Sequence, residues 1–377
     1  MNVFWAKFVD RYVGSALCLV LAPFRKRKTS FLRNVLFVQL WGLGETVCTL
    51  PAIKAFKSKY PKTEVAILAT DRNAAVYMGK GYIDELIVLK PGMLQLLKFS
   101  LKNRNHFDLA IDLEEYLNLS AIVSFFVARN SIGYDSQLRS SLYTTAVPYN
   151  DHVHVAEAFM NLLRPLKINS KVTSLEPLAI SKDSKLEAKK LLKYCGVSGN
   201  DFLVCIGIGT AESSKCRKWP VQNFAQIADY LIKDFKAKVV FVGSKGEIDE
   251  IDDTIKLMEH KALNLGGKTS TKGLFALLSR CKLFIGNDSG PMHVAAAQGV
   301  PTIGLFGPNL PQRFGPVGPK NKGIYKGEIC KYSPCINVHK GEVPDCCYGS
   351  GTQDYQKCMK NIRFEDVKKA IREVMEK

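Results

Sequence analysis

The chain has 377 residues, 46% of them hydrophobic and 23% charged, which is long enough for two folded globular domains and excludes a disordered chain. Its formal net charge of +18 indicates an anionic partner such as a membrane surface, a phosphorylated substrate or nucleic acid. We do not expect nucleic acid, because the chain has neither the interleaved aromatic and basic residues of an RNA-recognition motif nor a zinc-finger spacing.

The first 33 residues differ from the rest of the chain. Their aromatic residues recur at helical spacing: Phe4, Trp5, Phe8 and Tyr12. An apolar run follows at 16–24 and a basic run closes it at 25–28, which is too short to span a bilayer and has its charges on the wrong side for a signal peptide. We predict a helix at the surface of an anionic membrane, with a helix packed on the protein's own surface as the alternative.

From Val35 onward, short apolar segments rich in β-branched residues alternate with helical segments. The predicted strands are 35–40, 65–70, 86–89, 109–112, 203–208, 239–242, 283–285 and 302–306. Predicted helices include 222–235 and 248–259. This alternation predicts an α/β fold of doubly wound parallel sheets.

The strand pattern restarts near Leu203, after a charged stretch at 181–193. We therefore predict two Rossmann-like domains facing a central cleft. The predicted boundaries are 1–33 for the membrane-associating segment, 34–180 for the first domain and 181–360 for the second. The last segment, 361–377, is predicted to be a helix that packs back on the first domain.

A glycine turn, Gly42-Leu43-Gly44, follows the first predicted strand and leads into a helix beginning near Glu45. The third glycine of a dinucleotide-binding fingerprint is absent, so we do not predict such a site. Gly42 and Gly44 allow the backbone to approach a ligand closely. Glu45 is expected at the carboxyl end of the sheet, where doubly wound folds bind ligands; the alternative is an acid favoured only by the helix dipole.

A basic loop precedes Trp219-Pro220 in the second half. Its cations are Lys215, Arg217 and Lys218. Arginine and lysine both bind phosphate, and Thr210 offers a hydroxyl donor nearby. The alternative is an ordinary solvated loop.

The strand at 283–285 runs into Gly286-Asn287-Asp288-Ser289-Gly290-Pro291-Met292-His293. Pro291 suits the first turn of a helix, and the alanines that follow continue it. The free N–H groups of such a turn, near Ser289 and Gly290, form an anion site. Asp288 is expected to cap the turn or to orient a cation, and His293 to contact a phosphate oxygen or the ligand beyond it.

Five of the eleven cysteines lie late in the chain: Cys330, Cys335, Cys346, Cys347 and Cys358. Their spacing lacks a paired C-x-x-C, so a zinc ribbon is not predicted. We expect reduced thiols, with a metal or redox clip as the alternative. No carboxylate pair or histidine cluster among the motifs has the pattern of a metal-binding site.

Three blocks together resemble glycosyltransferase family 9, the heptosyltransferases of lipopolysaccharide core assembly. The blocks are Gly42 to Ala52, Gly207 to Ala225, and Asp288 to Pro308. The resemblance implies a GT-B fold, no cofactor, no catalytic metal, and a nucleotide sugar held mainly by the second domain. It implies a general base at Glu45, where the family usually has Asp, and a contact of Glu247 with the nucleoside ribose.

The resemblance thus implies an inverting transfer of a sugar to a lipopolysaccharide core or other lipid-linked acceptor. The sugar expected first is heptose, with ADP-heptose as its donor. The enzyme would be peripheral on the inner face of the cytoplasmic membrane. Three alternatives remain: transfer from another nucleotide sugar, a nucleotide-sugar epimerase of similar fold, and a binding protein without activity. The last is motivated by Glu45 in place of Asp.

Overall fold

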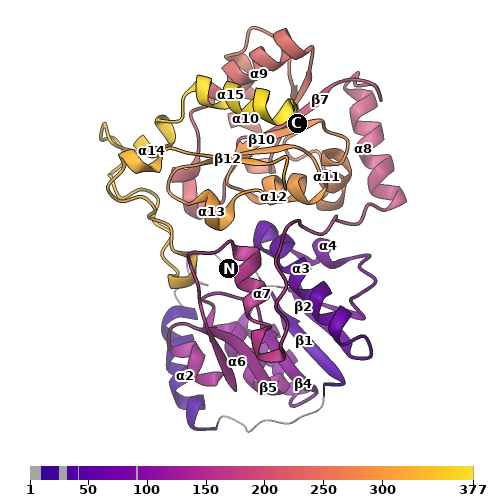
Figure 1. The fold of residues 1–377 in the computed structure, drawn as a ribbon, viewed down its shortest axis with the longest axis vertical. Coiled ribbons are helices and arrows are strands. Elements are labelled where there is room, and N and C mark those ends of the chain that lie inside the picture. The colour runs from indigo at the N-terminus through magenta and orange to yellow at the C-terminus, as the bar shows by residue number, and fades with distance from the viewer. Residues whose placement is uncertain (1–9, 25–31, 41, 91, 377) are drawn as a thin grey trace. The chain divides into compact units, whose positions relative to one another are not determined.

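In a computed structural model, the chain is described at residues 10–24, 32–40, 42–90 and 92–376 (Figure 1). It divides into two compact units. Unit 1 comprises Met1–Val172 and Val338–Gly341, and unit 2 comprises Thr173–Asn337 and Glu342–Lys377. The first division therefore falls before the predicted boundary at 180, and a short late segment belongs to unit 1.

Unit 1 is built on a six-stranded, all-parallel sheet in the order β3-β2-β1-β4-β5-β6. Its strands are β1 (Asn34–Val38), β2 (Glu64–Thr70), β3 (Glu85–Leu89), β4 (Phe107–Asp112), β5 (Ala128–Asp135) and β6 (Thr145–Pro148). Val35 lies opposite Val65 on one side and Leu109 on the other. The side chains of Val35 to Val38 are fully buried, as expected for a central strand covered on both faces.

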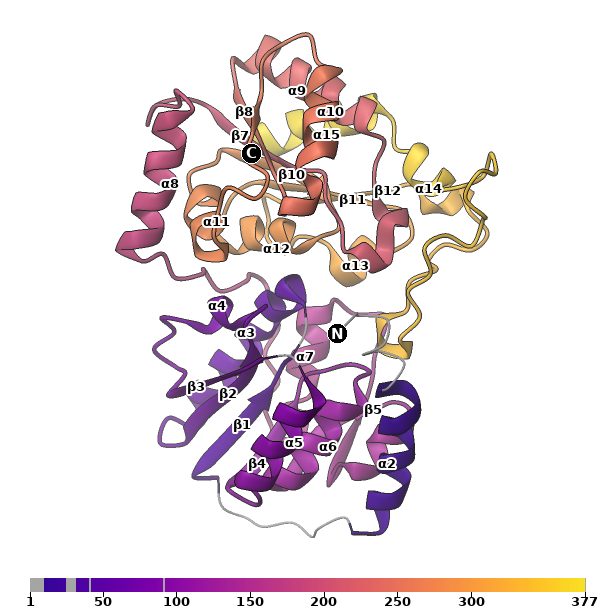
Figure 2. The same ribbon diagram turned by 180° about the vertical axis from the view of Figure 1, so that it is seen from behind.

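Helices cover the sheet of unit 1. They are α2 (Ser15–Leu21), α3 (Leu43–Lys59), α4 (Ala74–Tyr77), α5 (Met93–Lys102), α6 (Asn118–Val127) and α7 (Val155–Asn161), with short turns η1 (Asp10–Gly14), η2 (Ala22–Phe24), η3 (Leu138–Leu142) and η4 (Arg164–Leu166). Helices α3 and α7 pack against each other, whereas α6 packs against both α5 and α2. Figure 2 shows α5 and α6 in front of the strands.

Unit 2 repeats the same plan with the strand order β12-β11-β10-β7-β8-β9, again parallel throughout. Its strands are β7 (Leu203–Gly207), β8 (Lys238–Val242), β9 (Leu263–Asn264), β10 (Leu283–Asn287), β11 (Thr302–Phe306) and β12 (Lys322–Tyr325). Its helices are α8 (Lys182–Tyr194), α9 (Val221–Phe235), α10 (Ile248–Lys256), α11 (Thr271–Leu278), α12 (Gly290–Ala297), α13 (Pro311–Phe314), α14 (Lys357–Lys360) and α15 (Phe364–Met375). Its 3-10 turns are η5 (Glu212–Arg217), η6 (Lys245–Glu247), η7 (Gly327–Ile329) and η8 (Val338–Lys340), the last within the late segment of unit 1.

The predicted α/β fold of parallel sheets is confirmed, and each of the eight predicted strands is present. Strands β5, β6, β9 and β12 were not predicted. The last helix differs from its prediction. Helix α15 packs on α9, β11 and β12 within unit 2, and its buried side chains join the core of that unit. Val367, Ile371 and Val374 present one apolar face, which the sheet of unit 2 covers.

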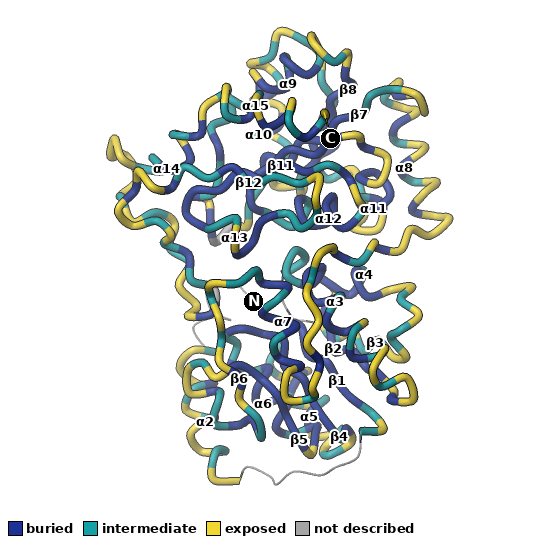
Figure 3. Tube along the Cα trace, in the orientation of Figure 1, coloured by how far each residue is buried: buried dark blue, intermediate teal, exposed yellow. Residues whose placement is uncertain are grey.

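The described part of the N-terminal segment packs on unit 1, the alternative considered for it. Asp10 accepts hydrogen bonds from the backbone N–H groups of Asn118 and Leu119 at 3.1 and 2.8 Å, and Cys18 is fully buried among residues of α6 and η3. Phe4, Trp5, Phe8 and the basic run at 25–28 lie outside the described residues. Among the helices that the structure describes, none is long and apolar enough to cross a bilayer. Figure 3 shows that buried backbone is concentrated in the strands and exposed backbone in the loops and outer helices.

Candidate functional site

The predicted ligand-binding residues of the second half gather at the carboxyl edge of the sheet of unit 2. Strands β7, β8 and β10 run in parallel and end at this edge. Thr210 and the basic loop follow β7, Glu247 follows β8, and Asp288 follows β10. This is the edge at which doubly wound sheets bind ligands.

Asn287 fixes the basic loop beside β10. Its amide donates to the carbonyl oxygen of Ile208 at 2.7 Å, and its Oδ1 accepts from the backbone N–H of Trp219 at 3.0 Å. Trp219 is buried, and its indole N–H donates to the carbonyl of Ile362 at 2.8 Å. The two ends of the loop are therefore anchored in the core while its basic side chains remain at the edge.

Asp288 orients Arg217. The guanidinium Nη1 donates to Asp288 Oδ2 at 3.1 Å and to the Asp288 carbonyl at 3.3 Å, and Nε donates to Ser214 Oγ at 2.7 Å. Asn309 also donates to Asp288 Oδ2, at 2.9 Å. Of the two roles expected for Asp288, the structure shows the orientation of a cation. Capping by its side chain is not observed, because no backbone N–H of α12 donates to the Asp288 carboxylate among the described residues.

The other two cations of the loop differ from each other. Lys218 forms an ion pair with Glu250 on α10. Lys215 is exposed, and its ammonium has no partner among the described residues, although its carbonyl accepts from Gln356 at 2.8 Å. Lys215 and Arg217 are therefore the better placed of the three to meet an added anion.

Glu247 lies over the glycines that end β7 and β8. A Cβ at Gly209 would lie 1.9 Å from Glu247 Oε1, and one at Gly243 would lie 2.8 Å from Oε2. The Glu247 carboxylate also accepts from the Ser244 backbone N–H at 2.6 Å. Nearby, the Thr210 hydroxyl is buried without a hydrogen-bond partner among the described residues, a state that a bound ligand would relieve.

Helix α12 begins at Gly290, with Pro291 in its first turn as predicted. Ser289 is the N-cap residue, but its side chain makes no capping hydrogen bond. Within the described chain, the backbone N–H groups of Ser289 and Gly290 meet no acceptor, so they are available to an anion at the positive end of the helix. His293 is buried, at 4% exposure, and it is therefore less accessible than the two amides.

In unit 1, the glycine turn forms the N-terminus of α3. Gly42 has a φ of +68°, a conformation that L side chains rarely adopt, and its carbonyl accepts from Thr46 N at 3.1 Å and Thr46 Oγ1 at 2.6 Å. A Cβ at Gly42 would lie 2.7 Å from Glu45 Oε2. The glycine thus makes room for the Glu45 carboxylate, which is only partly buried.

Buried acids and tyrosines surround the carboxyl edge of unit 1. Glu114 Oε1 accepts from the backbone N–H of Leu40 at 2.5 Å, and Glu115 Oε1 accepts from the Tyr149 hydroxyl at 2.8 Å. Burial raises the pKa of Tyr116, and the neighbouring Glu45 carboxylate raises it further. The Tyr116 phenol therefore stays protonated at neutral pH and remains a hydrogen-bond donor.

A fully buried ion pair lies at the end of β4. Arg139 Nη2 contacts Asp112 Oδ2 at 2.7 Å, and both side chains are 0% exposed. The Tyr143 hydroxyl donates to the same carboxylate oxygen at 2.7 Å, and Arg139 donates to the Glu114 carbonyl at 2.7 Å. Because both side chains are fully buried and hydrogen-bonded to neighbouring protein groups, this pair supports the fold of the edge.

The eleven cysteines, all at described positions, are free thiols. Cys330 and Cys358 are buried in unit 2, Cys335 and Cys346 are half-buried, and Cys347 is exposed. Burial raises the pKa of Cys358 to about 12. Across the described ranges, no group of three or more His, Cys, Asp or Glu is arranged to hold a metal ion.

Sequence reasoning did not assign roles to Asn287, Ser214, Asn309 or Glu250. Asn287 and Asn309 lie within or directly after the block that was singled out. Asn287 could have been found because it is an asparagine at the end of a buried strand. Its side-chain amide needs hydrogen-bond partners where the hydrogen bonds between strands stop, so a contact with a neighbouring loop is expected there.

Comparison with known proteins identifies a family. The sequence model of glycosyltransferase family 9 (heptosyltransferase) matches residues 96–340, more than half of the chain. This range includes the basic loop and Asp288, whereas Glu45 precedes it. A lipopolysaccharide core heptosyltransferase of Haemophilus influenzae is 25% identical over 75% of this chain and 82% of its own length. Lipopolysaccharide heptosyltransferase 1 of Campylobacter coli is 24% identical over 90% of this chain and 98% of its own length.

Solved structures share the fold. A glycosyltransferase family 9 protein of Veillonella parvula superposes with a TM-score of 0.76 and 24% identity, over 92% of this chain and 98% of its own. The ADP-heptose lipopolysaccharide heptosyltransferase II of Escherichia coli gives a TM-score of 0.71 at 19% identity, over 91% and 98% of the two chains.

Proposed function

The chain belongs to glycosyltransferase family 9 and is a glycosyltransferase of the heptosyltransferase type, and we propose that it transfers heptose from ADP-heptose to a lipopolysaccharide core. Curated relatives carry the names of lipopolysaccharide heptosyltransferases, and one solved relative is named for ADP-heptose. The nucleotide sugar is consumed as a substrate, so no separate cofactor is proposed. Family membership favours a transferase over the epimerase alternative.

The anion site of unit 2 is the observation that carries the proposal. Arg217 is held by Asp288, the Ser289 and Gly290 amides point from the start of α12, and the buried Thr210 hydroxyl has no partner in the described chain. In the proposed complex these donors bind the diphosphate of the donor and stabilise the charge that develops on it as the bond to the sugar breaks. Lys215 and Lys218 add positive charge, Glu247 contacts the ribose, and His293 lines the sugar side.

Glu45 is the proposed general base. A sugar hydroxyl is a poor nucleophile until its proton is accepted. As the hydroxyl oxygen attacks the anomeric carbon, Glu45 takes the proton, the bond from that carbon to the phosphate oxygen breaks, and ADP leaves with the bonding pair. One displacement inverts the anomeric configuration. Gly42 and Gly44 carry no side chain at the start of α3, so the acceptor can approach this carboxylate closely.

The proposed location is the inner face of the cytoplasmic membrane, where a lipid-linked acceptor is anchored. Beside the packed face of α2, Leu19, Val20 and Phe24 are 56%, 64% and 70% exposed. Helix α5 also presents Leu94 and Leu101, which lie two helical turns apart on one face, at 73% and 66% exposure. Exposed apolar side chains with nearby lysines and a net charge of +18 suit an anionic lipid surface.

A donor screen tests the proposal. Thermal unfolding is followed with ADP-heptose and with other nucleotide sugars, since a ligand at a hundred times its Kd stabilises by about 2.7 kcal/mol. Release of nucleoside diphosphate is then measured with and without lipopolysaccharide acceptor. Acceptor-dependent release from ADP-heptose is expected. Free altered sugar from donor alone would indicate an epimerase, and binding without turnover would indicate a protein that has lost activity.

A further inference from the structure

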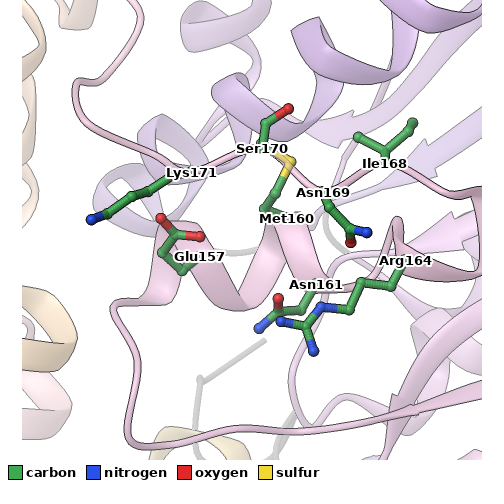
Figure 4. A pocket seen from close by; sticks show the side chains of 8 residues that line it. All are labelled: Glu157, Met160, Asn161, Arg164, Ile168, Asn169, Ser170 and Lys171. Atoms are coloured by element: carbon green, nitrogen blue, oxygen red, sulfur yellow. The ribbon is translucent and has the colours of Figure 1, made fainter.

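Two hollows in unit 1 share a wall that contains Arg164. The first has a volume of about 490 Å³ and is lined by residues of α7, by Arg164 and by residues 168–171 (Figure 4). The second has a volume of about 750 Å³ and is lined by residues 146–152 at the end of β6, together with Asn161, Arg164 and Pro165. Asn161 and Arg164 line both hollows, so a ligand in either one meets the same polar groups.

Hydrogen-bond donors converge at the shared wall. Figure 4 shows the side chains of Asn161, Arg164 and Asn169 together at one end of the first hollow, with Glu157 and Lys171 at the other. In the described chain, no hydrogen bond or ion pair occupies the Arg164 guanidinium or either amide side chain. An arginine with its five donors uncommitted is suited to grip a carboxylate or phosphate in a bidentate manner.

The two acids that line the hollows, Glu157 and Asp151, each have contacts with neighbouring groups. Glu157 Oε1 accepts from the Val172 backbone N–H at 2.6 Å, which fixes the outer wall of the first hollow. In the second hollow, Asp151 lies 3.5 Å from His152 Nε2 and 3.9 Å from His339 Nε2. Arg164, which lines both hollows, and Lys171, which lines the first, are therefore the exposed cations available to an incoming anion among the described residues.

The turn that carries Arg164 is held in place. Lys59 on α3 donates to the Lys167 carbonyl at 2.6 Å, and the Tyr60 hydroxyl donates to the Leu166 carbonyl at 3.2 Å. Lys167 N donates to the Arg164 carbonyl at 2.8 Å, with Lys167 itself in the left-handed conformation. A turn fixed in this way loses little entropy when a ligand binds.

The second hollow reaches the carboxyl edge that contains Glu45. Tyr149 lines this hollow, and its hydroxyl donates to Glu115 on the same edge. Strand β6 lies three strands from β1 in the sheet order, a lateral distance of roughly 14 Å at the usual spacing of strands. Tyr149 thus connects the carboxyl edge with the second hollow, whereas the turn of Arg164 contacts the C-terminal end of α3, roughly 20 Å from Glu45 along that helix. Only a saccharide of several rings that extends from Glu45 would reach Arg164.

We propose that the two hollows form a binding site for an anionic group of the saccharide acceptor, with Arg164 as its principal contact. The assignment of the ligand as an acceptor rests on the proposed function, whereas the binding of an anionic saccharide does not. The charged group is a carboxylate or a phosphate on a sugar ring. Asn161 and Asn169 donate to its oxygens or to neighbouring hydroxyls.

Binding is tested first without any transfer reaction. Saturation-transfer NMR compares glucuronate, glucose 6-phosphate and methyl glucoside on the full chain, with excess ADP present to occupy the donor site. The two charged probes, or one of them, are expected to bind, and methyl glucoside is not. If only glucuronate binds, the hollows form a carboxylate site. If only glucose 6-phosphate binds, they form a phosphate site. Binding that is absent in the parent, or unchanged in Arg164→Ala, overturns the proposal.

Kinetics then test the link to the acceptor. Arg164→Ala is expected to raise the acceptor KM about tenfold, with kcat and donor KM unchanged, since a charge-assisted hydrogen bond is lost. Arg164→Lys should recover part of the loss. Arg129→Ala, an exposed arginine at the opposite end of the sheet, serves as the matched control. If probe binding depends on Arg164 but Arg164→Ala leaves the acceptor KM unchanged, the hollows bind anions but do not bind the acceptor. That result would overturn the proposed role in acceptor binding. If the protein transfers no sugar at all, the proposed function fails, and the NMR result alone tests the anion site.

Discussion

Each of the two sheets has an aspartate at the carboxyl edge that pairs with an arginine, and the two pairs are used differently. The aspartate is the last residue of β4 in unit 1 and directly follows β10 in unit 2, and both strands lie next to the first strand of their unit. The arginine follows β5 in unit 1 and β7 in unit 2. In unit 1, Asp112 and Arg139 are both 0% exposed. In unit 2, the side chains of Asp288 and Arg217 are 5% and 16% exposed, and the guanidinium lies beside the free amides of α12.

This difference shows that surroundings, and not the pair itself, decide its role. The pair in unit 1 is closed on all sides by Tyr143 and by backbone carbonyls, so it can only support the edge. The pair in unit 2 retains one open side, so the aspartate orients a cation toward a ligand. The two edges differ in charge accordingly: unit 1 presents Glu45 and unit 2 presents a basic loop. One strand order thus carries a proton acceptor in one unit and an anion site in the other.

The largest effect is expected when the buried pair is broken. Arg139→Ala leaves the Asp112 carboxylate buried without its partner and should destabilise unit 1 by about 3–5 kcal/mol. Thermal unfolding and amide hydrogen exchange in β4 measure the loss. The binding of nucleoside diphosphate by the folded protein should not change. A loss below about 1 kcal/mol would contradict the supporting role.

The next effect concerns the open acid of unit 1. Glu45→Gln keeps the shape of the side chain but removes the proton acceptor, so kcat should fall by roughly 10²-fold or more with donor Kd unchanged. Steady-state transfer kinetics measure the first value and calorimetry the second. Glu85→Gln, an exposed acid at the start of β3, is the control. Near-normal kcat in Glu45→Gln would exclude Glu45 as the base.

Breaking the ion pair of unit 2 should weaken nucleoside diphosphate binding more than it lowers the stability of the fold. Arg217→Ala is expected to weaken nucleoside diphosphate binding by about tenfold or somewhat more, and Arg217→Lys should restore only part of it, because lysine lacks the fork of donors. Asp288→Asn should give a smaller loss through misorientation of Arg217. If calorimetry finds the same Kd in all three variants, the comparison between the two pairs fails and Lys215 becomes the residue to test.

The smallest effect is expected on the outer face of α2. Leu19→Gln combined with Val20→Gln should weaken binding to anionic vesicles by about fivefold, because two partly inserted apolar side chains are lost. Sedimentation with vesicles measures this, and binding of the parent should fall as salt rises. Leu186→Gln on α8, also exposed, is the control. Deletion of the segment is a poorer test, because α2 covers Ala121 and Ile122.

The sequence predicted those parts of the fold that long apolar runs define. Strand β5 was missed because polar residues such as Asn130 and Ser131 interrupt it, yet they are buried and hydrogen-bonded to Asp108 and Thr144. Strand β9 has two residues, too few for any pattern. The packing of α15 on unit 2 was not predicted. The apolar face of an amphipathic helix indicates that this face is covered, but it does not indicate which elements cover it.

The sequence singled out residues of the candidate site but not the contacts between them. Arg217, Asp288 and Glu45 were recognised from their places after strands, whereas the bond between Arg217 and Asp288 joins residues 71 positions apart. The anchoring of the loop by Asn287 likewise depends on strand neighbours. Sequence patterns report local periodicity, and contacts between loops at one sheet edge follow only once the strand order is known.

The late segment Val338–Gly341 has a consequence for synthesis. His339 stacks on the Tyr149 ring with centroids 4.5 Å apart, and its carbonyl accepts from Gln137 at 3.1 Å. Residues up to Val172 leave the ribosome roughly 10–30 s before these partners exist, at bacterial elongation rates of about 5–20 residues per second. Until then, the nascent first unit exposes the ring of Tyr149. The folding of unit 1 is therefore completed only after Val338–Gly341 has been translated.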